Sequence, residues 1–190
     1  MANESGDHAL RSFENEVRGN AMAQSQETLS GKRVLVTGAG TGIGPGVALA
    51  FARRGADVAL HYSHSEAGAR SVAQEAREMG VRAETFAADF SDIDQVLGLA
   101  RDAIDCLGGI DVLVNNAGIT MNRPFEQITI EQFDTLFNVN IRAMFFLTQV
   151  VAKDMITRGR GSVINLSSVH AYAGMTEHSA YAATKGAIVA

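Results

Sequence analysis

The sequence is poor in cysteine and has no run of basic residues. Cys106 is the only cysteine among 190 residues, which excludes an internal disulfide and a zinc site built from cysteines. The net charge of −5 and the missing basic cluster argue against binding to nucleic acid or to an anionic membrane surface. These absences leave a small neutral or anionic molecule as the expected ligand, in a reducing cytoplasmic compartment.

Continuous hydrophobic runs are short. No apolar stretch reaches the roughly 20 residues that span a bilayer. The first twenty residues lack the basic start and apolar core of a signal peptide. We therefore expect no membrane association.

Residues 1–30 are polar and weakly patterned. Such composition at a terminus is typical of a segment without fixed structure, so we interpret it as a flexible extension of one domain at 31–190. Met22 offers an alternative start within this extension, and a tail that binds a partner is the alternative interpretation.

From Lys32 onward, short β-branched segments alternate with segments of helical spacing. Strands are predicted at 32–37, 57–62, 82–88, 111–115 and 162–167. Helices are predicted at 43–54, 66–79, 92–107 and 131–158. Alternating elements of this length predict an α/β fold with a doubly wound parallel sheet.

The helix predicted at 131–158 is apolar on more than one face. Its large apolar residues are Phe133, Leu136, Phe137, Met144, Phe145, Phe146, Leu147, Val150, Val151 and Met155. A sheet covers only one face of a helix. Deep burial within the subunit and a homo-oligomer interface both remain open as explanations.

A glycine-rich turn, TGAGTGIG at 37–44, follows the first predicted strand and opens the first helix. Phosphate groups approach a helix N-terminus closely where Cβ atoms are absent, and the free N–H groups and the dipole there attract negative charge. Gly38, Gly42 and Gly44 meet this requirement. A glycine cluster can also be only a tight turn, but the flanking strand and helix favour a dinucleotide site.

The spacing of these glycines resembles the TGxxxGIG turn of the short-chain dehydrogenase/reductase family. This resemblance covers about Gly31 to Ala190 and implies a Rossmann fold that binds NAD(P)(H). Asp89 closes the third strand, as the family's adenine-side aspartate does. The segment Asn-Asn-Ala-Gly at 115–118 matches the family segment beside the cofactor, although by itself it could be an ordinary turn. The cofactor-binding residues that the resemblance implies are Thr37, Gly38, Gly42, Ile43, Gly44, Asp89, Asn116, Ala117, Gly118, Tyr181 and Lys185.

The end of the second predicted strand bears on the choice of cofactor. The chain reads His-Tyr-Ser-His at 61–64, without the acid that would bond the ribose 2′-hydroxyl of NAD, and Glu66 lies in the next helix. NADP(H) is therefore favoured over NAD(H), although Thr41 stands where many NADP(H)-dependent relatives carry a basic residue. His61 and His64 lack carboxylate or cysteine company, so no metal site is predicted.

The segment Tyr181-Ala182-Ala183-Thr184-Lys185 matches the family's YxxxK motif. Residues four apart share a helix face, so the ammonium lies near the phenol and favours its ionised form. By itself, a YxxxK sequence is more often a pair of surface residues than a catalytic pair. Ser168 stands thirteen residues before Tyr181, the separation found in the family. Asn140 resembles the family's helix asparagine, and Asn138 is the alternative candidate. A polar amide in so apolar a helix can also have a purely structural role, in which it bonds nearby backbone groups.

The resemblance implies an NAD(P)-dependent oxidoreductase that moves hydride between the cofactor and a carbonyl or secondary alcohol. Ser168 would bond the substrate oxygen and Tyr181 would exchange its proton, while Lys185 holds the nicotinamide ribose and Asn140 holds a water of the proton path. The expected substrates are a 3-oxoacyl thioester, a sugar or a small ketone. The alternatives are a cofactor-sensing module and a catalytically silent dinucleotide-binding fragment.

In the family, the sheet continues beside the fifth strand into two more strands and a substrate loop. The printed sequence ends five residues after Lys185. We therefore expect a sheet without its last strands and an unpaired edge on the fifth. Residues 1–190 alone are expected to aggregate or to behave as a loose, partly ordered species with negligible dehydrogenase activity. The full-length protein is expected to be a homo-oligomer.

Overall fold

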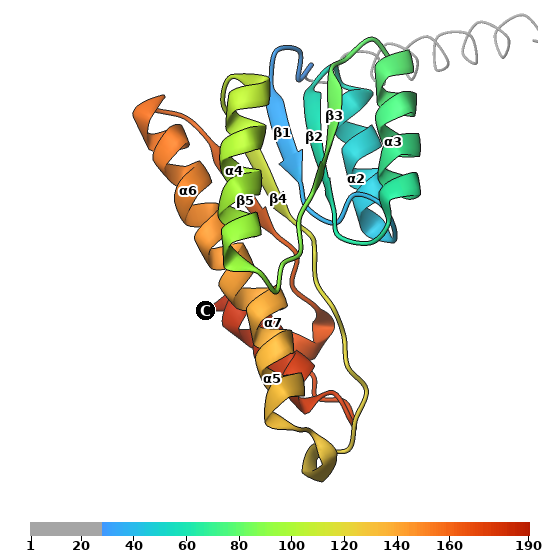
Figure 1. The fold of residues 1–190 in the computed structure, drawn as a ribbon, viewed down its shortest axis with the longest axis vertical. Helices are drawn as coiled ribbons and strands as arrows, with labels where there is room; N and C mark the ends of the chain where they lie inside the picture. The colour runs from blue at the N-terminus through green and yellow to red at the C-terminus, as the bar shows by residue number, and fades with distance from the viewer. Residues whose placement is uncertain (1–27) are drawn as a thin grey trace, which may run out of the picture.

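The computed structural model describes residues 28–190 and shows one parallel sheet with helices on both faces (Figure 1). The strands are β1 (Arg33–Val36), β2 (Asp57–Tyr62), β3 (Ala83–Ala87), β4 (Val112–Asn115) and β5 (Ser162–Asn165). Their order is β3-β2-β1-β4-β5, and every neighbouring pair is parallel. The predicted doubly wound α/β fold and all five predicted strands are confirmed, with ends that differ by at most two residues.

Two helices cover each face of the sheet, and two more lie beyond one of its ends. They are α2 (Ile43–Ala52), α3 (Glu66–Glu78), α4 (Ile93–Leu107), α5 (Ile130–Phe137), α6 (Ala143–Thr157) and α7 (Ser179–Val189). In Figure 1, α2 and α3 lie on one side of the sheet and α4 and α6 on the other. Helices α5 and α7 lie beyond the carboxyl ends of the strands, where ligands bind in open α/β sheets.

Alternation along the strands builds a separate core on each face. Val34 and Val36 of β1 belong to a buried cluster with residues of α2 and α3. Leu35, between them, belongs to a second cluster with residues of α4 and α6. Successive side chains of a strand point to opposite faces, so three consecutive apolar residues can serve both cores.

The helix predicted at 131–158 is not regular. A π-helical turn, η2 (Asn138–Arg142), separates α5 from α6. Hydrophobic spacing cannot reveal such a turn, because the apolar pattern continues across it. The turn contains Asn140, whose buried amide bonds the backbone of Ile119, and π-helical turns occur frequently at functional sites.

The helical run Ile130–Thr157 corrects the expectation that no segment is long and apolar enough to cross a membrane. It has 28 residues, and its most apolar window has a mean hydropathy of 1.2 and is 28% buried. Length and composition alone are weak support for a span, because a core helix passes the same test. In this structure, Leu147, Val151 and Met155 of α6 pack in the core shared with α4.

A buried carboxylate joins the amino ends of two central strands to the end of α6. Asp111 accepts hydrogen bonds from the Arg33 guanidinium at 2.9 and 3.0 Å and from Arg158 at 2.6 Å. Arg158 also pairs with Asp154 at 2.7 Å. The adjacent Arg33 guanidinium holds the pKa of Asp111 well below its usual range. We call Asp111, Arg33 and Arg158 the Asp111 cluster.

The two ends of the described chain differ in how they are held. Residues 28–30, placed in the expected flexible extension, are tied to the domain because the Leu29 N–H donates to the Arg54 carbonyl at 2.8 Å. The rest of that extension, including Met22, lies outside the described residues. Within residues 28–190, β5 pairs only with β4, and all four of its residues are exposed.

Candidate functional site

The glycine-rich turn between β1 and α2 has a backbone that only glycine accommodates well. Gly38 and Gly42 both have a φ of +66°, in the left-handed region. A Cβ on Gly44 would collide with the Gly38 backbone and one on Gly40 with Ser65, whereas a Cβ on Gly42 would meet nothing. Gly40 and Gly44 therefore allow close packing, and Gly42 faces open space. Sequence analysis missed Gly40, because its requirement comes from a residue 25 positions away.

Thr37 and Asn116 tie the ends of β1 and β4 together. The Thr37 hydroxyl accepts the N–H groups of Asn116 at 3.0 Å and Ala117 at 2.9 Å and donates to the Val114 carbonyl. The Asn116 amide donates to the carbonyls of Thr37 and Gly38. Thr37 is 1% exposed, and these bonds give its hydroxyl a positioning role; its contact with a cofactor stays a prediction.

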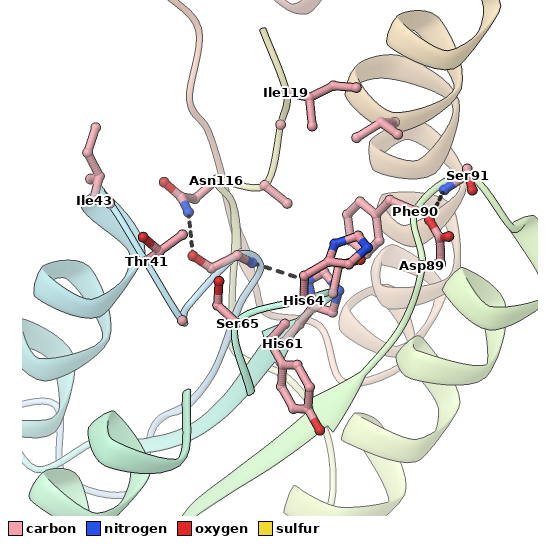
Figure 2. A pocket seen from close by; sticks show the side chains of 18 of the residues that line it. Thr41, Ile43, His61, His64, Ser65, Asp89, Phe90, Ser91, Asn116 and Ile119 are labelled. Carbon is pink, nitrogen blue, oxygen red and sulfur yellow. Dashed lines mark hydrogen bonds between the residues drawn. The ribbon is translucent and has the colours of Figure 1, made fainter. Parts of the chain in front are cut away.

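A cavity of about 670 Å³ lies at the carboxyl ends of β1 to β4, within the size range of small-molecule sites (Figure 2). Its lining comes from the glycine turn, the ends of β2 and β3, the segment after β4, and the helical segments α5 and η2. These residues are Gly38, Gly40, Thr41, Gly42, Ile43, His61, Tyr62, Ser63, His64, Ser65, Asp89, Phe90, Ser91, Asn116, Ala117, Gly118, Ile119, Thr135 and Val139. The cavity thus brings together every expected cofactor residue except Thr37, Gly44, Tyr181 and Lys185.

Asp89 stands at the rim of this cavity, at the end of β3 (Figure 2). Its carboxylate accepts the Ser91 N–H at 2.8 Å, and this bond lowers the pKa of Asp89 below its usual value. The exposed carboxylate is therefore ionised at neutral pH and available to a hydrogen-bond donor of a ligand. This position agrees with the adenine-side role that the resemblance implies.

Tyr181 and Lys185 line a second cavity of about 230 Å³. The Lys185 ammonium lies 5.7 Å from the centre of the Tyr181 ring and donates to the Leu166 carbonyl at 3.0 Å. Burial lowers the pKa of Lys185. Both cavities share Ile43, Asn116, Gly118 and Ile119 as lining residues, so they adjoin.

Asn140, and not Asn138, is the buried asparagine of the helical run, with an exposed fraction of 2%. Its amide oxygen accepts the Ile119 N–H at 2.8 Å, and its amide nitrogen donates to the Ile119 carbonyl and to the Thr184 hydroxyl. It therefore joins the segment after β4 to α7. A Cβ on Gly118 would lie 3.1 Å from the Asn140 oxygen and 3.6 Å from the Lys185 ammonium, so glycine leaves the space between them.

The two serines after β5 occupy different positions. The Ser168 hydroxyl accepts the His170 N–H at 3.2 Å and caps the short helix η3 (Val169–Ala171). Ser167 lines the Tyr181 cavity, and its hydroxyl donates to the Lys185 carbonyl at 2.8 Å. Spacing alone selected Ser168, and nothing in the sequence pattern distinguishes the two side chains.

The histidines near the two cavities, His61, His64, His170 and His178, form no group that could bind a metal ion. His61 uses both ring nitrogens in hydrogen bonds within the protein, so it has no nitrogen left for a metal. His170 and His178 gather around the Tyr181 ring, with ring centres 6.0 and 6.2 Å from it. Residues 28–190 contain no group of three histidine, cysteine or acidic side chains that could hold a metal ion.

Burial of His61 has a consequence for stability. Burial lowers its pKa to about 4 from an ordinary value of 6.5. Between these pH values the unfolded chain binds a proton that the folded chain does not, so acidification favours unfolding. We expect the free energy of unfolding to fall by about 3 kcal/mol from pH 6.5 to pH 4. Urea titrations of the protein and of His61→Asn measure this, and parallel pH curves for the two proteins would contradict it.

Known proteins resemble this chain over most of its described length. The family model for short chain dehydrogenase matches residues 32–190. The hydroxynaphthalene reductase-like protein Arp2 of Metarhizium anisopliae is 39% identical over 171 residues, which are 88% of this chain and 63% of that protein. The chain therefore spans less than two thirds of that relative.

Solved structures agree in fold. A short chain dehydrogenase from Burkholderia cenocepacia J2315 in complex with NADP superposes with a TM-score of 0.80 at 34% identity, covering 86% of this chain and 66% of that one. A 7α-hydroxysteroid dehydrogenase complexed with NADH and 7-oxo glycochenodeoxycholic acid gives a TM-score of 0.81 at 33% identity, covering 85% and 62%. With the fold, the glycine turn and the paired Tyr181 and Lys185, these matches show that the chain belongs to the short-chain dehydrogenase family.

Proposed function

We propose that this protein is an NAD(P)-dependent oxidoreductase that interconverts a carbonyl and a secondary alcohol, with a 3-oxoacyl thioester, a sugar or a small ketone as substrate. The main support for the proposal is that the cavity at the glycine turn adjoins the cavity at Tyr181 and Lys185. A dinucleotide extended from the first cavity into the second would place its nicotinamide end beside the tyrosine. The bound cofactor would supply or accept the hydride.

The chain's own residues then handle the proton and the substrate oxygen. Tyr181 exchanges the proton with that oxygen, and the nearby Lys185 ammonium stabilises the ionised phenol. Ser168 donates a hydrogen bond to the same oxygen, whereas Ser167 lines the cavity with its one hydroxyl hydrogen already donated to the Lys185 carbonyl. Asn140 fixes the segment after β4 against α7 and so maintains the spacing between the cofactor side and Lys185.

Assays of cofactor oxidation test the proposal. The protein, with any residues that follow Ala190 in its gene, is mixed with NADPH or NADH and a panel of 3-oxoacyl thioesters, sugars and ketones. Substrate-dependent oxidation supports the enzyme. Tight dinucleotide binding without turnover across the panel supports the alternative of a silent or sensing dinucleotide-binding module.

NADP(H) is the proposed cofactor, because the end of β2 offers polar groups without a free acid. Ser65 is the N-cap of α3, and its hydroxyl makes no capping bond, so it and the helix N-terminus remain open to a 2′-phosphate. Glu66, which follows Ser65, pairs with Arg70 at 2.6 Å, and Asp89 lines the same cavity from the end of β3. Tyr62 and Ser63 line the same cavity, and neither is an acidic residue.

We expect NADP(H) to bind at least as tightly as NAD(H) in calorimetric titrations. Ser63→Asp would place a carboxylate beside the 2′-phosphate and should move the ratio of dissociation constants toward NAD(H) by tenfold or more. A preference of the unmodified protein for NAD(H) above tenfold, about 1.4 kcal/mol, would contradict the assignment.

A homo-oligomer and a cytoplasmic location complete the proposal. Large apolar side chains remain exposed along α5 and α6, including Ile130, Phe145 and Ile156 at 76%, 59% and 77% exposure. Exposed apolar side chains spread along this helical run favour contact with a second copy of the chain. The cytoplasmic assignment rests on the single cysteine.

A further inference from the structure

His61 lies under the glycine turn and has almost no contact with solvent, with an exposed fraction of 1% (Figure 2). Its Nδ1 is 3.2 Å from the Gly38 nitrogen and its Nε2 is 3.0 Å from the Ala88 carbonyl oxygen. A backbone N–H only donates and a carbonyl only accepts. Nδ1 is therefore the acceptor and Nε2 carries the hydrogen, so a single neutral tautomer satisfies both bonds.

The imidazole is held on a third side by an aromatic ring. Phe90 stacks on His61 with ring centres 4.2 Å apart and planes inclined by 9°. The backbone adds another link, because the Ala39 N–H donates to the His61 carbonyl at 2.7 Å. His61 thus joins two consecutive residues of the glycine turn to the end of β3.

These contacts connect two walls of the larger cavity. Gly38 belongs to the wall formed by the glycine turn, whereas Phe90 and its neighbour Asp89 belong to the wall formed by the end of β3. The Gly38 N–H is already bonded to His61, which removes it from the donors that a bound phosphate could use. The imidazole thus links the glycine turn to the wall at the end of β3.

We propose that His61 is a positioning residue of the dinucleotide site, which holds the glycine turn at a fixed separation from the adenine-side wall by accepting the Gly38 N–H. The inference rests on the proposed function only in taking a dinucleotide as the ligand. Sequence analysis considered His61 only as a metal ligand and dismissed it for lack of carboxylate or cysteine company. It missed the positioning role, because the two partners lie 23 and 27 residues away and leave no local signal.

Three variants separate the two hydrogen bonds. An asparagine at this position has a side-chain oxygen near the place of Nδ1 and can still accept from Gly38. A glutamine reaches the place of Nε2 and can still donate to Ala88, while a leucine does neither. We expect His61→Asn to keep the dissociation constant for NADP(H) within about threefold of the parent, and His61→Gln and His61→Leu to raise it at least tenfold.

Calorimetry measures the dissociation constants at a temperature where urea titrations show every protein to be folded. Val58→Ala, in the buried core of the same strand, is the control for lost stability without loss of the Gly38 bond. The rate of backbone hydrogen exchange over residues 37–44 should increase in His61→Gln and His61→Leu but not in His61→Asn. The positioning role is overturned if glutamine and leucine bind like the parent, or if asparagine or Val58→Ala weakens binding as much as leucine. A parent that binds no dinucleotide would instead overturn the proposed function, and this inference with it.

Discussion

Replacement of Tyr181 by phenylalanine is expected to lower kcat by about 10²- to 10⁴-fold, because the variant keeps the ring but loses the group that exchanges the proton. The dissociation constant for the dinucleotide should stay within about threefold. The cavity lining and the Lys185 bond to Leu166 do not depend on the phenol oxygen, so the fold should be preserved. Steady-state kinetics and calorimetry on a chain that includes any residues following Ala190 give both numbers.

Tyr172→Phe is the matched control, since Tyr172 is 80% exposed and does not line the Tyr181 cavity. This variant should retain the parent kcat. Ser168→Ala and Ser167→Ala, compared side by side, show which hydroxyl meets the substrate oxygen, with a loss smaller than that of Tyr181→Phe. An unchanged kcat in Tyr181→Phe would show that another group exchanges the proton.

Removal of the Asp111 carboxylate is expected to destabilise the fold by about 3 to 5 kcal/mol, which is a large share of the stability of a typical domain. The Asp111 side chain is 4% exposed, and those of Arg33 and Arg158 are 16% and 19% exposed. Asp111→Ala leaves two poorly solvated guanidinium groups without their shared partner. Asp111→Asn keeps part of the hydrogen bonding and should cost less. Urea titrations at pH 7 measure both variants.

The difference in free energy of unfolding between the parent and Asp111→Ala should depend on pH, because the pKa of Asp111 is lowered in the folded protein. A carboxylate whose pKa is lowered in the folded state contributes stability above its unfolded pKa, and the contribution is lost as the pH falls through the folded value. The gap between parent and Asp111→Ala should therefore persist from pH 8 down to about pH 4 and shrink only in stronger acid. Asp105→Ala, at an exposed position of α4, should change stability by no more than about 0.5 kcal/mol. Equal effects of the two substitutions would contradict the proposed importance of the Asp111 cluster.

Local pattern was sufficient to predict the fold. Each strand and helix has its own period of apolar residues, and the glycines at 38, 42 and 44 mark the join of β1 and α2, so short windows of sequence contain the signal. The π-helical turn has no such signal, because α5 and α6 continue the same apolar spacing on either side of it.

The candidate site was predicted less completely, for reasons that individual residues illustrate. Tyr181 and Lys185 share one helix turn, so their spacing alone places them together. His61 and Gly38 follow different strands and meet only in the folded protein. Which of Ser167 and Ser168 lines the Tyr181 cavity depends on how the short segment after β5 turns. Contacts of this kind depend on tertiary packing and cannot be predicted from neighbouring residues.

The two separate buried clusters have a consequence for how this chain can change. Because the clusters have no residue in common, a substitution among the side chains of α2 and α3 leaves the packing of α4 and α6 intact. The first group supports the glycine-turn side of the larger cavity, whereas the second supports its opposite wall at Phe90 and carries α6, whose exposed face would meet another copy in the proposed oligomer. Changes on the glycine-turn side of the cavity and changes in α6 can therefore accumulate independently, because neither requires repair of the opposite core.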